Sequence, residues 1–488
     1  MPEWLQWIYD PALVLLGIVL FALQIGGIVA AGHAVMTNRT SQGTIAWVLF
    51  LLTFPTLAVP MYLVFGGHRF RGYIRARRAD DQAVREAADS YAKKIEAFRV
   101  PLAENTQGIH VIERLAHLPL TRGNTTELLV DGEATFRSIF KGIAAAREYI
   151  LVQFFIVRAD GLGCELRDRL LEKLREGVRV YFLYDEIGSR KLPRAYLQSL
   201  RRAGAEIYPF NASVGWRHPL RLNFRNHRKI VIADGKTAWV GGHNVGDEYL
   251  GRSKRMGHWR DSHIKVTGPS VQCIQFTFLD DWYWATTTIP DFRWTPEAAV
   301  DTEAEEARDV VVLPGGPADE VETITLAFLH AINSAQHRVW IQSPYFVPDD
   351  QIVSALQLAA LRGVDVRILL PEKPDHLLVW LSSFYFTGQE KLRHVRIYRY
   401  LPGFLHSKIL LVDNSIATIG TANLDNRSFR INFELMVGVV DPGFAAEVES
   451  VMKRDFENAR EVGPEDYNNR PLWFRVAART ARLLAPIQ

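Results

Sequence analysis

Cysteine is almost absent from this chain, which has only Cys164 and Cys273 among its 488 residues. Two cysteines cannot form a framework of several disulfides, and they cannot supply a cysteine-rich zinc site. We expect both to be free thiols in a reducing compartment. The motifs described below also lack the cluster of carboxylates that suits Mg²⁺, so we expect no metal and no other cofactor.

The chain also lacks a strong excess of charge of either sign. Its formal net charge is +3, whereas a protein that mainly binds nucleic acid is expected to be strongly basic. We therefore expect no nucleic-acid partner. The hydrophobic fraction of 48% and the charged fraction of 23% are ordinary for globular proteins, and the length allows two or more domains.

Two stretches near the N-terminus have no charged residue, at 12–32 and 44–67. Each reaches the ~20 residues needed to cross the core of a bilayer. We expect a transmembrane hairpin in residues 1–67, with spans at about 12–34 and 44–66. A cleaved signal peptide fits less well because residues 1–11 lack a basic side chain and a second apolar stretch follows. Two buried helices of a soluble core are the remaining alternative.

Arginine is unevenly distributed around these stretches. The turn between them has one, Arg39, whereas five follow the second stretch: Arg69, Arg71, Arg75, Arg77 and Arg78. The positive-inside rule then places the turn outside and the remaining ~400 residues in the cytoplasm. The five arginines would lie against anionic headgroups. We interpret residues 68–110 as a basic juxtamembrane segment followed by a linker helix.

The body of the chain repeats one pattern of elements. Strand-like runs at 149–156 and 178–184 enclose a helical segment, and runs at 339–342 and 364–370 enclose another. Each half is a β-α-β unit, which predicts an α/β fold of two duplicated domains with a mixed sheet flanked by helices and a pseudo-twofold relation. We expect the first repeat at 111–300 and the second at 301–470.

A short motif occurs once in each repeat, and the two copies lie 179 residues apart. Each copy has a His, a Lys two residues later, an Asp seven residues later and an Asn seventeen residues later. The two sets are His227, Lys229, Asp234 and Asn244, and His406, Lys408, Asp413 and Asn423. Residues two apart on a strand share a face, so each His and Lys should project together. Each Asp falls at a hairpin turn, which favours a structural role.

These residue types suit exchange at a phosphodiester. One His can attack phosphorus to form a phosphohistidine, and the other can protonate the leaving oxygen and later deprotonate the incoming alcohol. The two lysines, with Asn244 and Asn423, would bind the phosphoryl oxygens. A nucleophilic His needs a carboxylate on its other ring nitrogen, and Asp261 and Glu434 are the candidates. Two sets of residues indicate one active site built from two halves.

The paired motifs resemble the phospholipase D superfamily, and within it the bacterial cardiolipin synthases. The narrower resemblance depends on the runs Asn-Leu-Asp-Asn-Arg-Ser-Phe at 423–429, Asn-Phe-Glu at 432–434 and Ser-Pro-Tyr-Phe-Val-Pro at 343–348, and on the N-terminal apolar hairpin. It implies transfer of a phosphatidyl group between two phosphatidylglycerol molecules, with release of glycerol, at the bacterial inner membrane. It also implies that His227 is the nucleophile and His406 the general acid and base, with anionic membrane lipids as partners.

Other functions remain open at this point. A hydrolytic phospholipase D would use the same residues with water as the acceptor. A membrane-tethered nuclease fits the modest charge poorly, and a non-catalytic scaffold fits two intact motifs poorly. A homo-oligomer is open as well.

Two segments outside the motifs allow two interpretations each. In the tail, residues 471–488, Arg475, Arg479 and Arg482 share one helical face opposite an apolar face. This pattern predicts an interfacial membrane helix, with packing on the body as the alternative. The apolar run at 377–386 either contacts acyl chains or forms an ordinary core helix.

Overall fold

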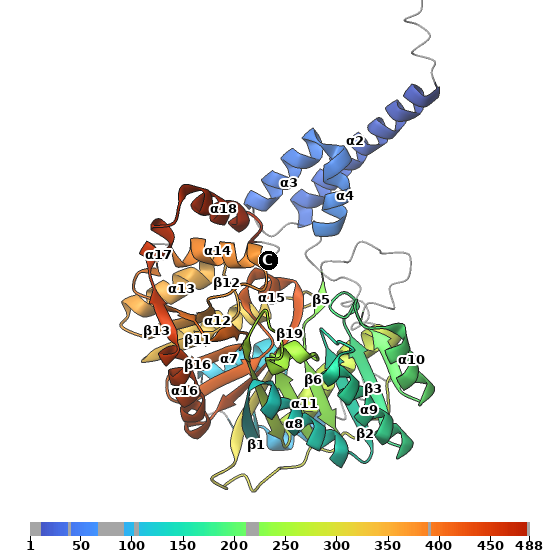
Figure 1. The fold of residues 1–488 in the computed structure, drawn as a ribbon, viewed down its shortest axis with the longest axis vertical. Helices are drawn as coiled ribbons and strands as arrows, with labels where there is room; N and C mark the ends of the chain where they lie inside the picture. The colour runs from blue at the N-terminus through green and yellow to red at the C-terminus, as the bar shows by residue number, and fades with distance from the viewer. Residues whose placement is uncertain are drawn as a thin grey trace, which may run out of the picture. The chain divides into compact units, whose positions relative to one another are not determined.

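The computed structural model describes residues 11–37, 41–66, 92–101, 107–210, 224–388 and 392–485. The chain divides into two compact units, an N-terminal helical unit and a much larger α/β body (Figure 1).

Helix α2 (Pro11–Thr37) is the only helix in the described part of the chain that is long and apolar enough to cross a membrane. Its 27 residues extend over about 40 Å at 1.5 Å per residue, more than the ~30 Å of a hydrocarbon core. Only Gly27, Ala31 and Ala34 are buried along it, so nearly all of its surface is apolar and exposed. This helix agrees with the first expected span.

The second expected span is interrupted, because residues 44–66 do not form one helix, and whether they cross the membrane stays a prediction. They lie in α3 (Ser41–Thr53) and α4 (Pro55–Phe65), which are separated at Phe54. Pro55 has no N–H to continue α3 and restricts the residue before it, and Phe54 has left the helical region at φ −132° and ψ 58°. An α3 of 13 residues reaches only about 20 Å.

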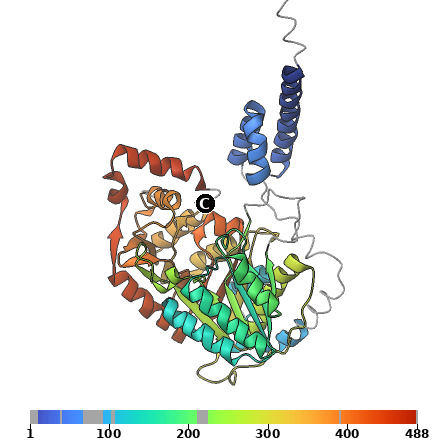
Figure 2. The same ribbon diagram turned by 45° about the vertical axis from the view of Figure 1, so that its right-hand side comes forward.

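The chain reverses its direction at this break. The rings of Trp47 in α3 and Tyr62 in α4 lie 5.1 Å apart, although a straight helix would separate these residues by about 22 Å. Gln24 of α2 donates to the carbonyl of Leu52, 3.3 Å away, and His33 shares a 2.8 Å hydrogen bond with the Tyr62 hydroxyl. Helices α3 and α4 therefore form a short hairpin that packs along the C-terminal half of α2, as Figure 2 shows.

The body is built on one continuous sheet with a mirrored strand order. The first repeat contributes, from the centre outward, β1 (Thr121–Val130), β9 (Ser262–Thr267), β7 (Thr237–Gly241), β6 (Ile230–Ala233), β2 (Tyr149–Phe154), β3 (Arg179–Tyr184) and β4 (Glu206–Pro209). The second contributes β10 (Arg308–Gly315), β19 (Asn432–Val440), β17 (Ile416–Gly420), β16 (Ile409–Val412), β11 (Arg338–Gln342), β13 (Asp365–Pro371), β14 (Arg396–Tyr400) and β20 (Ala459–Val462).

The two halves meet where β1 pairs antiparallel with β10, and the same pairings recur on both sides. Strand β2 is parallel to β3 and antiparallel to β6, and β11 is parallel to β13 and antiparallel to β16. One hydrophobic core runs through both halves. This arrangement confirms the expected α/β class, the mixed sheet and the duplication; the residue limits of the two repeats stay a prediction.

Amphipathic helices flank the sheet in both repeats. The first has α8 (Asp131–Ala145), α9 (Gly161–Arg175), α10 (Arg194–Arg202) and α11 (Ser270–Thr286), and the second has α12 (Thr323–Ser334), α13 (Asp350–Leu361), α14 (Leu377–Thr387) and α16 (Pro442–Glu457). An Asp side chain caps the N-terminus of α9, α13 and α16 by accepting a backbone N–H. The last two helices in the described part of the chain are α17 (Pro464–Asn468) and α18 (Leu472–Arg482).

Candidate active site

In each repeat, a short strand directly precedes the motif histidine and pairs with a strand of the other repeat. Strand β5 (Arg225–Asn226) runs parallel to the start of β19, and the backbone N–H of His227 donates to the carbonyl of Phe433 at 2.9 Å. Strand β15 (Gly403–Leu405) runs parallel to β8 (His258–Arg260), and the N–H of His406 donates to Arg260 at 2.7 Å. The backbone therefore fixes both histidines at the junction of the repeats.

Each histidine is oriented by a carboxylate of the other repeat. Nδ1 of His227 lies 2.9 Å from Oε2 of Glu434, and Nδ1 of His406 lies 2.7 Å from Oδ2 of Asp261. Both carboxylates are fully buried. A carboxylate that accepts Nδ1–H leaves the lone pair of the neutral imidazole on Nε2, where it can attack phosphorus or accept a proton. The structure thus brings together all four of these expected site residues.

Glu434 is held by three further donors. The hydroxyls of Thr421 and Ser428 donate to it at 2.6 and 2.8 Å, and the Asn432 amide donates at 3.2 Å. Burial acts to raise the pKa of this carboxyl, but His227, Lys229 and Thr421 outweigh it and hold the pKa below its ordinary value. Glu434 is therefore ionised. The three donors were not predicted, although Ser428 and Asn432 lie in runs that carried the family resemblance.

The two motif lysines are also deeply buried in this site. Nζ of Lys229 donates to the carbonyl of His227 at 2.5 Å, and Nζ of Lys408 donates in the same way to His406. Burial lowers the pKa of Lys229 to about 7 and that of Lys408 to about 8, against the opposing charges of Glu434 and Asp261. A bound anion would offset much of the free-energy cost of burying the two charged ammonium groups, because it would place a negative charge beside them.

Both histidines are neutral near pH 7 in the empty site. Burial, with Lys229 and Lys408, lowers the pKa of His227 to about 4 despite the charge of Glu434. Burial, with the charges of Lys408, Lys229 and His227, lowers the pKa of His406 well below its ordinary value. Residues of both motifs act on each histidine, so the two motifs form one electrostatic unit.

The motif asparagines are buried beside the histidines. Oδ1 of Asn244 accepts the backbone N–H of Ile156 at 3.0 Å, and its amide donates to the Tyr249 hydroxyl at 3.1 Å. The amide of Asn423 donates to Asp425 at 3.3 Å. Their expected binding of phosphoryl oxygens stays a prediction, and it requires these amide donors to change partner when a phosphate is bound.

Asp234 and Asp413 lie at the far ends of the motif hairpins, in the turns that follow β6 and β16. Asp234 accepts the backbone N–H groups of residues 147–149 at 2.7–2.9 Å. Asp413 accepts those of residues 336–338 at 2.7–3.2 Å. Both residues have a positive φ, 53° and 51°, which Asp tolerates in turns. We assign both a structural role, in which they join the turn to the start of β2 or β11.

A buried network in the first repeat supports the backbone at Glu434. Arg228 donates to the Glu434 carbonyl at 3.0 Å and forms an ion pair with Asp281 of α11 at 2.8 Å. Gln153 donates to the same aspartate at 2.7 Å.

A related network supports the backbone at Asp261, with the arginine supplied by the first repeat and the glutamine and aspartate by the second. Arg260 donates to the Asp261 carbonyl at 2.7 Å and forms an ion pair with Asp455 of α16 at 2.8 Å. Gln342 donates to Asp455 at 2.7 Å. The equivalent positions of Gln153 and Gln342 were visible in the sequence, but the aspartates were not, because each lies more than 100 residues from its glutamine.

Two further arginines lie close to the histidines. Arg225 lies in β5, two residues before His227, and Arg427 precedes Ser428, which donates to Glu434. Burial lowers the pKa of both guanidinium groups, with Asp185 acting in the opposite direction on each, and the charge of Arg225 lowers the pKa of Arg427 further. These two neighbouring cations give the site a positive region beside Glu434.

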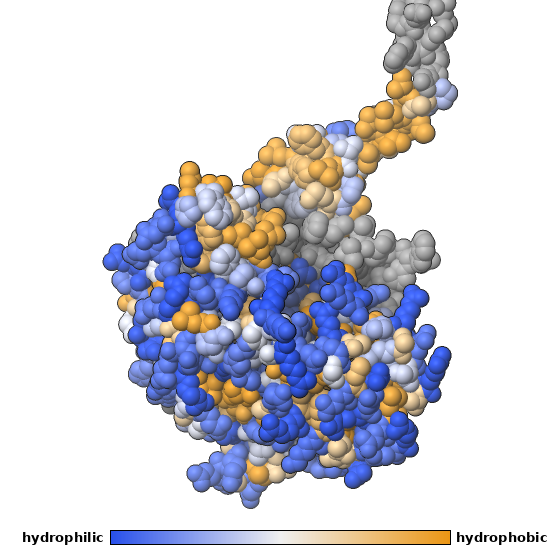
Figure 3. Space-filling view, in the orientation of Figure 1, coloured by the Kyte–Doolittle hydropathy of each residue, from blue (hydrophilic) through white to orange (hydrophobic). Residues whose placement is uncertain are grey.

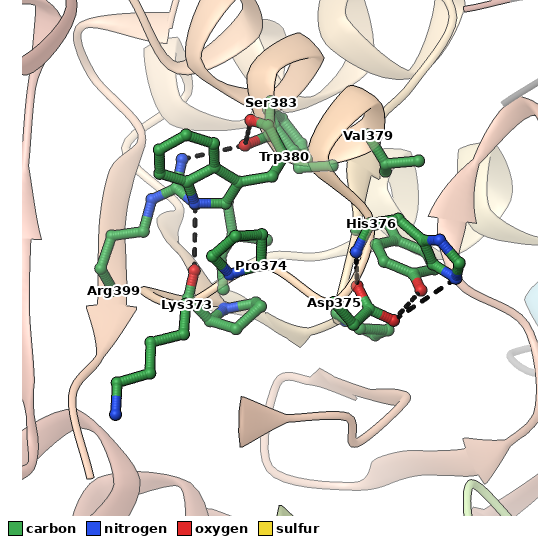
Figure 4. A pocket seen from close by; sticks show the side chains of 13 residues that line it. Lys373, Pro374, Asp375, His376, Val379, Trp380, Ser383 and Arg399 are labelled. Atoms are coloured by element: carbon green, nitrogen blue, oxygen red, sulfur yellow. Dashed lines mark hydrogen bonds and ion pairs between the residues drawn. The ribbon is translucent and has the colours of Figure 1, made fainter. Parts of the chain in front are cut away.

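A small pocket lies between the turn after β13 and the start of α14. Figure 4 shows Asp375 and His376 on one side of this pocket and Val379 and Trp380 on α14. The Tyr345 hydroxyl donates to Asp375 at 2.5 Å. Ser343, two residues before Tyr345, accepts the backbone N–H of Leu424 at 2.9 Å, which links this wall of the pocket to the second motif at Asn423.

Comparison with known proteins agrees with this geometry. The family model described as cardiolipin synthase, PLD-like domain, matches residues 139–266 and 328–456, so each match contains one complete motif. A model described as phospholipase D-nuclease N-terminal matches residues 26–67.

Whole-chain relatives support the same assignment. The chain is 46% identical to cardiolipin synthase A of Pseudomonas aeruginosa (strain LESB58) over 97% of this chain and 96% of the relative. It is 46% identical to cardiolipin synthase A of Pseudomonas putida (strain W619) over 96% of this chain and 98% of the relative. The crystal structure of a Haemophilus influenzae phosphatidylserine synthase shares the fold with a TM-score of 0.58 at 16% identity, covering 78% of this chain and all of the other. The chain therefore belongs to the cardiolipin synthase family of phospholipase D-like enzymes.

Proposed function

We propose that this chain makes cardiolipin by transferring a phosphatidyl group from one phosphatidylglycerol to the terminal hydroxyl of another. The observation that carries the proposal is the reciprocal pairing of His227 with Glu434 and of His406 with Asp261. It fixes both rings through Nδ1 and leaves each Nε2 available, so that one histidine can attack phosphorus while the other gives and takes a proton.

In the first step, Nε2 of His227 attacks the phosphorus of the donor lipid. A P–N bond forms while the P–O bond to glycerol breaks, and His406 gives its Nε2 proton to the departing glycerol oxygen. In the empty site the imidazole of His406 is neutral and its Nε2 carries no proton. Once the lipid is bound, the negative phosphodiester favours the protonated imidazole. Lys229 and Lys408 bind the phosphoryl oxygens throughout.

In the second step, the acceptor lipid reverses these events. His406, now neutral, takes the proton from the terminal hydroxyl of the second phosphatidylglycerol, and that oxygen attacks phosphorus. The P–O bond of cardiolipin forms, the P–N bond breaks, and His227 returns to its starting state. The assignment of attack to His227 follows the family, because the pseudo-symmetry makes the two histidines nearly equivalent.

The acceptor differs from water because it carries a phosphate of its own. Arg225, in the short strand β5, lies two residues before His227, and its charge acts on Arg427. We assign these arginines to the acceptor phosphate, where they favour a lipid alcohol over water.

A product assay tests the function directly. The purified full chain is incubated with phosphatidylglycerol alone and then with phosphatidylethanolamine added. We expect cardiolipin and glycerol in equal amounts. Phosphatidic acid as the main product would instead identify a hydrolytic phospholipase D.

We further propose that the chain crosses the membrane once, through α2, with the body in the cytoplasm. The hairpin of α3 and α4 then enters and leaves the bilayer on the cytoplasmic side. Arg39 and the arginines at 69–78 would all lie on that side, in accord with the positive-inside rule. A two-span hairpin would leave Arg39 outside.

A further inference from the structure

Helix α18 carries its large apolar side chains on the outside. The residues that pack on the body are Phe474, Ala478 and Ala481, which are buried. The outward side chains are Leu472, Trp473, Val476 and Leu483, with 69%, 70%, 54% and 76% of their surface exposed. A surface helix that only packs on its own domain has the opposite distribution.

Helix α14 extends this apolar surface. It packs against α18 through a cluster that contains Phe384 and Phe474. At its N-terminus, Leu377 and Leu378 are 61% and 51% exposed. Figure 3 shows apolar side chains gathered over α14 and α18, on a body whose surface is otherwise largely polar in this view. Both helices pack on the body, and each also keeps an exposed apolar side, so contact of these segments with lipid stays a prediction.

Arginines line one flank of α18. Arg479 donates to the Tyr467 hydroxyl at 3.2 Å, and the guanidinium of Arg482 lies 4.3 Å from the centre of the Tyr385 ring. Arg475 is on the same flank. Basic side chains next to an outward apolar face are characteristic of helices that lie in the interface of an anionic bilayer.

Helix α14 links this surface to the segment that supports the second motif. It begins directly after His376, and its Val379 and Trp380 line the pocket shown in Figure 4, together with Tyr345. Two residues before Tyr345, Ser343 accepts the backbone N–H of Leu424, next to the motif residue Asn423.

We propose that the surface formed by α14 and α18 inserts into the interface of an anionic bilayer and is the route by which the lipid substrate reaches the site. The proposal rests on the proposed function for the identity of that substrate. Helix α2 brings the chain to a membrane, whereas this surface determines which face of the body meets the lipid. Because its outer residues are apolar and its flank is basic, an anionic lipid interface matches it in both respects.

Site-directed spin labelling of the full chain tests the contact. Val476→Cys places a nitroxide on the surface, and Asp168→Cys on α9, whose side chain is 61% exposed, is the matched control. Both are made with Cys164→Ser, since Cys273 is buried. In vesicles of phosphatidylglycerol and phosphatidylethanolamine, we expect the label at 476 to collide with oxygen and to be shielded from a water-soluble nickel complex, and the label at 168 to behave oppositely. A label at 476 that is as accessible to nickel as the control overturns the proposal, as does strong coupling between labels of two copies, which would make the surface a dimer interface.

Activity on two forms of one substrate provides a second test. The variant Trp473→Ser/Val476→Ser/Leu483→Ser is compared with Leu358→Ser/Leu361→Ser, which changes two exposed leucines of α13. On phosphatidylglycerol vesicles, we expect kcat/KM of the first variant to fall about tenfold and that of the control to change less than twofold. On monomeric short-chain phosphatidylglycerol, both should match the unchanged protein. An equal loss on vesicles and monomers overturns the proposal, because it indicates damage to the fold. If the unchanged protein makes no cardiolipin from either form, the proposed function fails, while the labelling result still decides the membrane contact.

Discussion

Glu434 of the second repeat holds His227 of the first, with Oε2 only 2.9 Å from Nδ1, and the same relation joins Asp261 to His406 in the opposite direction. Neither repeat therefore contains a complete catalytic group. A separated repeat would have a histidine without the carboxylate that fixes its tautomer, so the site needs residues from two repeats.

Removing the negative charge of either orienting carboxylate should abolish most of the activity while the fold is retained. We expect Glu434→Gln and Asp261→Asn each to lower kcat by at least about 100-fold, because the amide no longer fixes the tautomer or stabilises the imidazolium. The measurement is the initial rate of cardiolipin formation, with thermal unfolding as the check on folding. Glu449→Gln changes a surface carboxylate paired with Arg338 and serves as the control. A loss under tenfold in both site variants would contradict the orienting role.

The order of the two histidines can be decided with a substrate that needs no general acid. A phosphatidyl ester of p-nitrophenol has a leaving group that departs as the anion. With this substrate we expect His406→Ala to form a phosphohistidine at position 227, detected by mass spectrometry of peptides, and His227→Ala to form none. An adduct on His406 in the His227 variant would reverse the assignment.

The sequence predicted the four motif residues of each repeat and the two orienting carboxylates, because local spacing and chemistry identify them. It could not predict that Glu434 serves His227 rather than His406, since that pairing depends on β5 crossing to β19. It also could not reveal Asp281 and Asp455, which stand on helices far along the chain and are linked to the site only by tertiary packing.

The break in the second apolar stretch could not be predicted for a different reason. Hydropathy shows only that residues 44–66 are apolar enough to lie in lipid. Hydropathy does not reveal the direction of the chain, which changes at Phe54 because Pro55 interrupts the helical hydrogen bonds. The contact between Trp47 and Tyr62 then stabilises the reversed arm.

The buried lysines should reduce stability while serving catalysis. The pKa of Lys229 falls from 10.5 to about 7 on folding, so between these pH values the unfolded chain binds a proton that the folded chain does not. Stability from this group therefore rises as pH increases from 7 to 10.5, and Lys229→Met should stabilise the fold at pH 7 by on the order of 2 kcal/mol while abolishing transfer. Unfolding midpoints at pH 7 and 9.5 measure this, with the exposed Lys236→Met as the control. A Lys229→Met protein that is less stable at pH 7 would contradict it.

The activity should fall as pH rises, whereas the stability contributed by Lys229 increases. The protonated lysines bind the phosphodiester, and deprotonation begins near the pKa values of about 7 for Lys229 and about 8 for Lys408. We expect kcat/KM to fall as pH rises above 8, even though the protein becomes more stable. A kcat/KM that rises steadily to pH 10 would exclude phosphate binding by charged lysines.

Arg427 should control the choice between lipid and water. We expect Arg427→Gln to raise the ratio of phosphatidic acid to cardiolipin at least about fivefold, because the acceptor phosphate loses a charged hydrogen bond. Formation of the phosphohistidine, measured in a single turnover, should change much less. Arg454→Gln replaces an exposed arginine of α16 and is the control. An unchanged product ratio would remove Arg427 from the acceptor site.

The proposed single crossing by α2 would place the N-terminus and the body on opposite sides of the membrane. A reporter fused to the N-terminus should therefore be active only if it functions outside the cytoplasm, while one fused to the C-terminus should require the cytoplasm. Replacing Pro55 and Pro60 with leucine removes both prolines from the second stretch, and the expected result is a continuous span over 41–65 that is long enough to cross. The N-terminal reporter should then change its signal, because two crossings return the chain to the side on which it began. An N-terminal reporter that is cytoplasmic in the unchanged protein would show that α3 and α4 already cross the bilayer.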